Sequence, residues 1–147
     1  ASPAFTVNSQ VAGSAATSAV TWLRNGAACG YINFTGSTVE FTNSSDYRLK
    51  KDVISITNGL ESVCRLNPVS FKWTRGDIDD IGFIAHEVQN VVPLAAFGEK
   101  DAVNEDGSVK PQQIVMDKLV PVLVAAVKEL KGIVDAQAAE IAELKAK

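Results

Sequence analysis

Hydrophobic and polar residues follow three different patterns along this chain of 147 residues. In the first part, residues 1–44, they alternate over short stretches such as 31–34 and 38–41, and Asn25-Gly26 precedes both stretches. A period of two is typical of β-strands, and Asn-Gly is typical of a tight turn between them. About forty residues of this kind bury too little apolar surface to fold alone, so we expect them to depend on other copies or on upstream sequence.

The second part, residues 46–115, mixes helical and extended patterns, so we expect an α+β fold there. Apolar spacing and turn residues predict five elements. In chain order they are a helix that begins at 57–61, a strand at 69–73, a buried strand at 81–84, a short helix at 85–91 and a hairpin turn at 104–107. An acid-rich turn is expected at 77–80.

The last thirty residues carry apolar side chains at alternating spacings of three and four. This is the a/d pattern of a heptad repeat, and it is typical of a helix that associates with other helices in a coiled coil. The positions are Val120, Leu123, Val127, Leu130, Val134, Gln137, Ile141 and Leu144. Gln137 occupies a d position, where a polar residue can fix the register. The alternative is a helix that packs only on its own domain.

A change in charge divides the chain near residue 45. Residues 1–44 contain only two charged side chains, Arg24 and Glu40, whereas charges are frequent after Asp46. We therefore predict three domains: a β-rich segment (1–45), an α+β body (46–115) and a C-terminal coiled-coil helix (116–147). The fold class is α+β, with a long C-terminal helix and a short β-rich segment in front.

Composition excludes several classes of function. Seventeen acidic residues outnumber 14 basic ones, and the basic ones form no cluster, which argues against nucleic-acid binding. No apolar run approaches the ~20 residues that a membrane span needs. Cys29 and Cys64 lack metal-ligand spacing, so we expect no metal and no cofactor, with reduced thiols favoured over a disulfide.

The candidate chemistry lies at the boundary, in the segment from Ser45 to Lys50. A serine hydroxyl becomes a nucleophile when a base takes its proton, and a lysine can be that base when burial or nearby positive charge lowers its pKa. Five residues apart on one helix, Ser45 and Lys50 would point in different directions, whereas a turn could bring them together. The spacing alone is a weak motif, and a polar linker explains it equally well.

Several ordered motifs strengthen this hypothesis, because together they resemble a known family. They are Ser45-Asp46-x-Arg48-x-Lys50, then Leu66-Asn67-Pro68-Val69-Ser70-Phe71-Lys72-Trp73, then Gly82-Phe83-Ile84-Ala85-His86-Glu87-Val88 with Pro93, and finally Leu119-Val120-Pro121-Val122-Leu123 with Ala126, Lys128, Glu129 and Leu130. In this order they resemble the self-cleaving intramolecular chaperone domain at the C-terminus of phage tailspikes, tail fibres and neck appendages, including endosialidase-type tailspikes. The resemblance covers residues 45–147.

The resemblance implies a homotrimeric chaperone that templates the folding of an upstream fibre and then releases itself by autoproteolysis. Residues 1–45 would then be the β-rich C-terminal tip of that fibre or tailspike. It implies a serine-lysine dyad of Ser45 and Lys50, cleavage of the Ser45-Asp46 bond, and possible support from Arg48. Assembly is expected in the host cytoplasm, after which the mature fibre joins the virion tail and binds a host-surface receptor. His86 stands where the family usually has glutamine, and we assign it no role.

Two questions stay open from the sequence. Attack by Ser45 Oγ on its own carbonyl passes through a strained four-membered ring, and attack on the preceding carbonyl would break Ser44-Ser45 instead. A hydroxyl from another protomer or an activated water are the other routes. The alternative function is a non-cleaving trimerisation and receptor-binding tip, in which aromatic residues of the β-rich segment line a binding site. A conventional hydrolase with a catalytic triad is disfavoured, because the sequence has no Gly-x-Ser-x-Gly motif.

Overall fold

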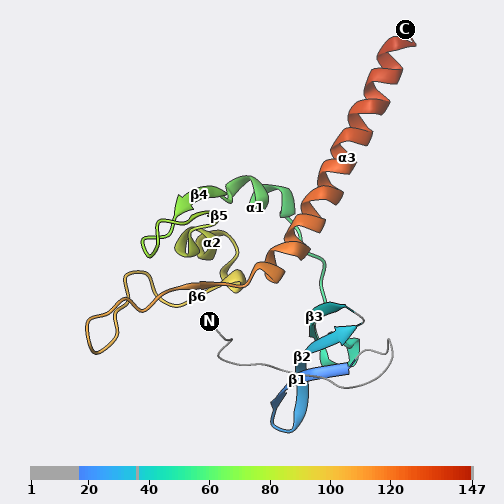
Figure 1. The fold of residues 1–147 in the computed structure, drawn as a ribbon. Helices are drawn as coiled ribbons and strands as arrows, with labels where there is room; N and C mark the ends of the chain where they lie inside the picture. The colour runs from blue at the N-terminus through green and yellow to red at the C-terminus, as the bar shows by residue number, and fades with distance from the viewer. Residues whose placement is uncertain (1–16, 36, 147) are drawn as a thin grey trace. The chain divides into compact units, whose positions relative to one another are not determined.

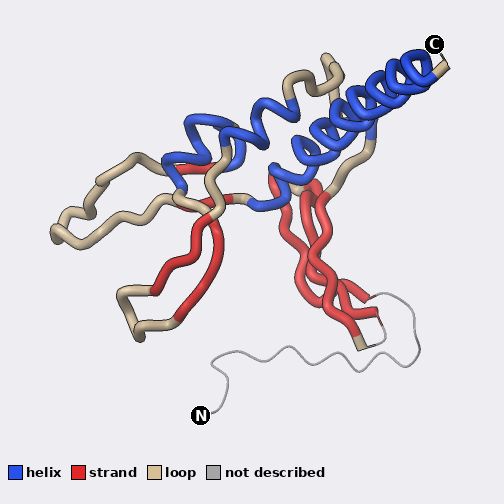
Figure 2. Tube along the Cα trace, turned by 90° about the horizontal axis from the view of Figure 1, so that it is seen from above, coloured by secondary structure: helices blue, strands red, loops and turns tan. Residues whose placement is uncertain are grey.

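This computed structural model describes residues 17–35 and 37–146, and the chain divides into two compact units. The first unit ends at Val53 and the second begins at Ile54. Each unit is built from small antiparallel sheets, and the second also contains the helices (Figures 1 and 2). The prediction of a mixed α and β fold with a long C-terminal helix is confirmed.

The first unit is a three-stranded antiparallel meander. It consists of β1 (Thr17–Arg24), β2 (Ala27–Thr35) and β3 (Thr38–Asn43), in that order across the sheet. Asn25 and Gly26 join β1 to β2 with positive φ angles of 53° and 78°, as the Asn-Gly turn predicts. Every residue of β3 is exposed, including Phe41 at 77%. The sheet therefore leaves apolar surface uncovered in the single chain.

The second unit follows the predicted order of helices and strands. It contains α1 (Gly59–Arg65), β4 (Val69–Lys72), β5 (Asp79–Gly82), α2 (Ala85–Val91), β6 (Ala96–Phe97), β7 (Gln113–Ile114) and α3 (Leu119–Lys145). Single turns of 3-10 helix, Pro93–Ala95 and Met116–Lys118, precede β6 and α3. Val88, Ala95, Ala96 and Leu119 form its buried core. This core is small, because one residue of α3 and three short elements, α2, the Pro93–Ala95 turn and β6, supply all of it.

The β4–β5 hairpin differs from the sequence prediction. A buried strand was expected at 81–84, but β5 is Asp79–Gly82 and Ile81 is 81% exposed. The turn between the strands ends before the expected turn at 77–80 does, because the Trp73 amide donates a hydrogen bond of 2.9 Å to the Ile78 carbonyl. Two acidic residues of the expected turn, Asp79 and Asp80, therefore lie in the strand, whereas Asp77 precedes it. Apolar character alone could not predict burial here, because the described residues leave the Ile81 side chain exposed.

The second predicted hairpin has the expected turn. Val103 and Val109 form an antiparallel bridge, and the Asn104 amide donates to the Ser108 carbonyl at 2.9 Å. Gly107 takes a φ of 79°, which a residue without a Cβ adopts without strain.

Helix α3 has two different apolar faces. Leu119, Val122 and Ala126 are buried against its own unit. The a/d seam is offset from this face by about one residue, or roughly 100°, and its apolar residues remain 46–66% exposed. The C-terminal part of the helix extends away from the rest of the second unit (Figures 1 and 2). None of the described helices is long and apolar enough to cross a membrane.

Two glycines give opposite stability predictions. A Cβ on Gly59 would lie 2.6 Å from both the Ala125 Cβ and the Ala126 backbone nitrogen, whereas one on Gly132 would meet open space. Gly59→Ala should therefore lower the free energy of unfolding by about 1–3 kcal/mol through overpacking. Gly132→Ala should raise it by about 0.5–1 kcal/mol through helix propensity. Thermal unfolding of both variants checks this, and equal effects would contradict the packing of α1 on α3.

Candidate functional site

The structure brings Ser45 and Lys50 together. Lys50 Nζ donates a hydrogen bond to Ser45 Oγ at 2.7 Å. Ser44, just before the serine, is held on the sheet, because its amide donates to the Cys29 carbonyl at 3.2 Å and its hydroxyl to the Ala28 carbonyl at 3.1 Å. The candidate nucleophile thus lies immediately after the last residue that the sheet fixes.

A single turn of 3-10 helix, Tyr47–Leu49, accounts for this geometry. The Leu49 amide donates to the Asp46 carbonyl at 3.1 Å, and the Lys50 amide to the Tyr47 carbonyl at 3.0 Å. This tight turn has about three residues per turn and ends after one turn. The chain then returns to extended backbone at Lys50 (φ −117°, ψ 142°), so that the lysine side chain can reach back to the serine.

Asp46 caps this turn and binds Arg48. Its carboxylate accepts from the Arg48 amide (2.9 Å), from Nε (2.9 Å) and from a terminal guanidinium nitrogen (2.6 Å). The side-chain hydrogen bonds from Arg48 are the largest cause that holds the pKa of Asp46 below its ordinary value, followed by the Arg48 amide and the charge of Lys50. The carboxylate raises the pKa of Arg48 in return. Arg48 therefore supports the turn rather than Ser45 directly.

Arg48→Ala should raise the pKa of Asp46 toward its ordinary value of 3.8, because the guanidinium no longer stabilises the carboxylate. A carboxyl whose pKa is depressed in the folded state stabilises that state above the ordinary pKa, and the contribution is lost as pH falls through the folded value. Carboxyl titration by NMR, in chains that also carry Ser45→Ala, measures the shift. An Asp46 pKa that is identical with and without Arg48 would contradict the ion pair.

The dyad is open to solvent in the single chain. Ser45 and Lys50 are both exposed, and so are the apolar side chains next to them: Tyr47 (81%), Leu49 (75%) and Val53 (78%). Proton transfer from serine to lysine needs a neutral amine and exclusion of bulk water. A single copy supplies the hydrogen bond but not the shielding. The exposed apolar residues offer a surface that a second protein surface would cover.

None of the hydrogen bonds found among the described residues joins the dyad to the other residues considered from the sequence, which are His86, Cys29 and Cys64. His86 is in the first turn of α2, in the second unit, and lines a surface hollow together with Lys100 and Asp101. Hydrogen bonding to Lys100 is the main cause that lowers the pKa of Asp101, and the charge of His86 contributes least. Cys29 and Cys64 are free thiols. Among residues 17–35 and 37–146, no cluster of His, Cys, Asp and Glu is arranged to hold a metal ion.

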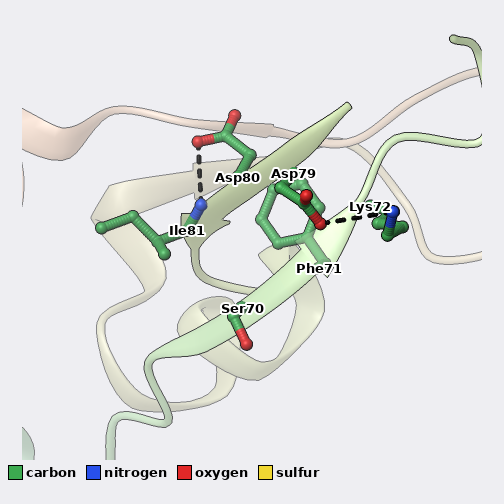
Figure 3. A pocket seen from close by; sticks show the side chains of 6 residues that line it. All are labelled: Ser70, Phe71, Lys72, Asp79, Asp80 and Ile81. Carbon is green, nitrogen blue, oxygen red and sulfur yellow. Dashed lines mark hydrogen bonds and ion pairs between the residues drawn. The ribbon is translucent and has the colours of Figure 1, made fainter. Parts of the chain in front are cut away.

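A second hollow lies on the β4–β5 hairpin (Figure 3). Ser70, Phe71 and Lys72 line it from β4, and Asp79, Asp80 and Ile81 from β5. Each charged group there already has a partner: Lys72 pairs with Asp79 at 3.6 Å, while Asp80 accepts from the Ile81 amide at 2.8 Å and from Trp73 Nε1 at 3.0 Å. These contacts stabilise the two-stranded hairpin. Among the described residues, no hydrogen bond joins Ser70 to a basic side chain.

One polar residue with an unusual role was missed by the sequence reasoning. Glu129 on α3 accepts hydrogen bonds from the amides of Gly59 and Leu60, both at 2.8 Å. The partners are about 70 positions apart in the chain, and the sequence marks Glu129 only as one residue of the last family motif, without a role. In the structure, Asn58 at the start of α1 makes no side-chain cap, which leaves these amides for Glu129.

Comparison with known proteins gives one match. Residues 45–97 match the family model described as chaperone of endosialidase, a family classed among the peptidases. No curated protein matches the chain. The matched segment begins at Ser45 and includes the dyad, α1, the β4–β5 hairpin and α2. The resemblance that the sequence motifs indicate is thereby confirmed for residues 45–97, which are similar to the chaperone of endosialidase family.

Proposed function

We propose that this chain is a trimerising intramolecular chaperone that templates the folding of an upstream phage fibre or tailspike and then releases itself by one cut at Ser45-Asp46. The observation that carries the proposal is the 2.7 Å hydrogen bond between Lys50 Nζ and Ser45 Oγ, at the first residue of the family match. The enzyme is a serine peptidase that acts once, on its own chain. The mature fibre then joins the virion tail and binds a host receptor.

The chemistry uses the dyad as nucleophile and base. Neutral Lys50 takes the proton of Ser45 Oγ, and the oxygen attacks the carbonyl carbon of the scissile bond. The new C–O bond forms an ester while the C–N bond breaks, and the proton passes from Lys50 to the leaving amine of Asp46. Water then hydrolyses the ester and regenerates the serine. Asp46, held by Arg48, fixes the orientation of the leaving amine.

The attacking hydroxyl comes from a neighbouring copy in this mechanism. Within one chain, Ser45 Oγ would have to form a four-membered ring with its own carbonyl, whereas Ser45 of another copy meets no such strain. The exposure of Ser45 and Lys50 leaves room for this approach. Burial of Tyr47 and Leu49 by the neighbour would exclude water from the lysine at the same time.

Assembly proceeds through the exposed seam of α3. Seven apolar side chains and Gln137 occupy the a/d positions of the seam. They are exposed within the described part of the chain. Three helices that bury these side chains against one another bring the upstream segments together at high effective concentration. Intertwined β-structure has many non-local contacts and folds slowly, so prior gathering of the chains speeds its assembly. Cleavage afterwards leaves the fibre behind a high unfolding barrier.

The experiment is a time course of intact mass for the chain expressed with upstream fibre sequence. The proposal expects two fragments whose masses sum to the precursor plus one water, and no fragments from Ser45→Ala. A stable full-length wild type that trimerises would favour the alternative, a non-cleaving trimerisation and receptor-binding tip.

Mixed trimers test which copy supplies the hydroxyl. Wild-type chains and tagged Ser45→Ala chains are denatured together, refolded and analysed by mass. Attack between copies predicts that tagged Ser45→Ala chains are cut in mixed trimers, because a wild-type neighbour supplies the nucleophile. Pure Ser45→Ala trimers are the control and stay intact. Tagged chains that stay intact next to cut wild-type chains would show attack within one chain.

A further inference from the structure

The start of α1 is capped by a residue from another helix. Glu129 on α3 places one carboxylate oxygen on the Gly59 amide and the other on the Leu60 amide, each at 2.8 Å. Asn58, the residue in the cap position, is in the left-handed conformation (φ 59°, ψ 31°) and makes no side-chain cap of its own. The first amides of a helix need an acceptor. Glu129 supplies it, so the beginning of α1 is fixed to α3.

Close packing strengthens the same joint. Gly59 is buried, and a Cβ at this position would come within 2.6 Å of the backbone nitrogen of Ala126. A backbone atom inside a helix cannot move aside as a flexible side chain can. The hydrogen bonds and this close approach act on adjacent residues of α1. We call Gly59, Leu60 and Glu129 together the α1–α3 joint.

The position of the joint connects it to both assembly and the dyad. On α3, Glu129 lies between the seam residues Val127 and Leu130 in sequence, but it faces α1 rather than the seam. On the other side, Gly59 follows Lys50 by nine residues, which span at most about 30 Å when fully extended. No helix or strand interrupts this connection. Gathering three α3 helices therefore also limits where three copies of Lys50 can lie.

We propose that Glu129 is a positioning residue that couples assembly of the α3 helices to ordering of the dyad. The inference rests on the proposed function, and it adds a residue outside the dyad and outside the seam. Glu129 anchors α1, and the nine-residue connection joins α1 to Lys50. Removal of the carboxylate leaves the a/d seam intact but releases the start of α1. Trimers then form in which the Ser45-Lys50 pair of one copy meets its neighbour less often.

The test compares Glu129→Gln with three other variants. Glu143→Gln is the matched control, since Glu143 occupies the same heptad position two heptads later on α3 and is exposed. Gly59→Ala disturbs the joint from the α1 side. Val88→Ala loses core packing elsewhere, at a residue that is 1% exposed, and controls for loss of stability. Oligomer mass and the rate of cleavage within isolated trimers are measured for each.

Glu129→Gln and Gly59→Ala are expected to form trimers that cleave about ten- to a hundredfold more slowly, the scale of loss expected when reacting groups are misplaced by about 1 Å. Glu143→Gln should cleave at the wild-type rate, and Val88→Ala should do so while melting at a lower temperature. Equal rates in Glu129→Gln and wild-type trimers would overturn the inference, and so would equal slowing by Val88→Ala.

A second measurement separates this inference from the proposed function. In Ser45→Ala chains, which lack the nucleophile, hydrogen exchange reports the Leu49 and Lys50 amides that close the dyad turn. Trimerisation should protect these amides at least tenfold, by about 1.4 kcal/mol, and Glu129→Gln should remove that protection. If trimerisation protects these amides but wild-type chains are never cleaved, the proposed function is wrong, while the coupling between α3 assembly and the dyad turn still holds. No change in protection with Glu129→Gln would overturn the coupling.

Discussion

Lys50→Ala will leave the chain uncut, with a cleavage rate at least about a thousandfold below wild type, the usual cost of removing one member of a nucleophile-base pair. Lys50 Nζ is the only amine that an observed hydrogen bond brings to Ser45 Oγ among the described residues. Without it the hydroxyl keeps its proton and attacks poorly. Intact mass after overnight incubation of assembled trimers measures the effect.

Lys51→Ala is the matched control. It removes the same side chain one position later, where the structure gives the lysine no contact with Ser45, and it changes the net charge equally. It should cleave within about twofold of wild type. Cleavage by Lys50→Ala at the rate of Lys51→Ala would show that the serine-lysine contact has no catalytic role.

Leu130→Asp will convert the trimer to monomers and thereby prevent cleavage. Leu130 lies at a d position of the seam and is 48% exposed in the single chain. Three carboxylates brought together at one layer of a coiled coil repel each other and lose their hydration. We expect the concentration needed for assembly to rise at least about a thousandfold, or ~4 kcal/mol. Light scattering across a dilution series measures it.

Ala139→Asp is the control for this variant. Ala139 occupies an outward f position of the same helix, so the substitution introduces the same charge away from the seam. It should stay trimeric and cleave normally. If Leu130→Asp also stays trimeric, the heptad assignment is wrong; if it becomes monomeric and still cleaves, cleavage needs no neighbour.

Local signals explain why much of the fold could be predicted from the sequence. Asn25-Gly26 and Asn104–Gly107 form their turns because glycine and asparagine adopt positive φ readily, a property independent of distant residues. The long helix was predictable because its apolar periodicity is sustained over many turns. The contact of Ser45 with Lys50 needed the ordered family motifs as well, because the same spacing on a longer helix would separate them.

Features that depend on distant contacts could not be predicted. Ile81 was expected to be buried, but burial depends on what packs against the β4–β5 hairpin, and the described residues leave the Ile81 side chain exposed. The role of Glu129 depends on a partner 70 positions away. The two interpretations of α3, packing on its own domain or joining other copies, proved compatible. The buried residues Leu119, Val122 and Ala126 lie on one face, and the exposed seam lies on another.

The amino terminus of the released fragment shows which bond is cut. Wild-type chains with upstream fibre sequence are allowed to assemble, and the products are analysed by intact mass and by amino-terminal sequencing. The account predicts a fragment of residues 46–147 that begins Asp46-Tyr47-Arg48, absent from Ser45→Ala. A fragment that begins at Ser45, or assembled trimers that remain full length, would contradict cleavage of Ser45-Asp46 by this dyad.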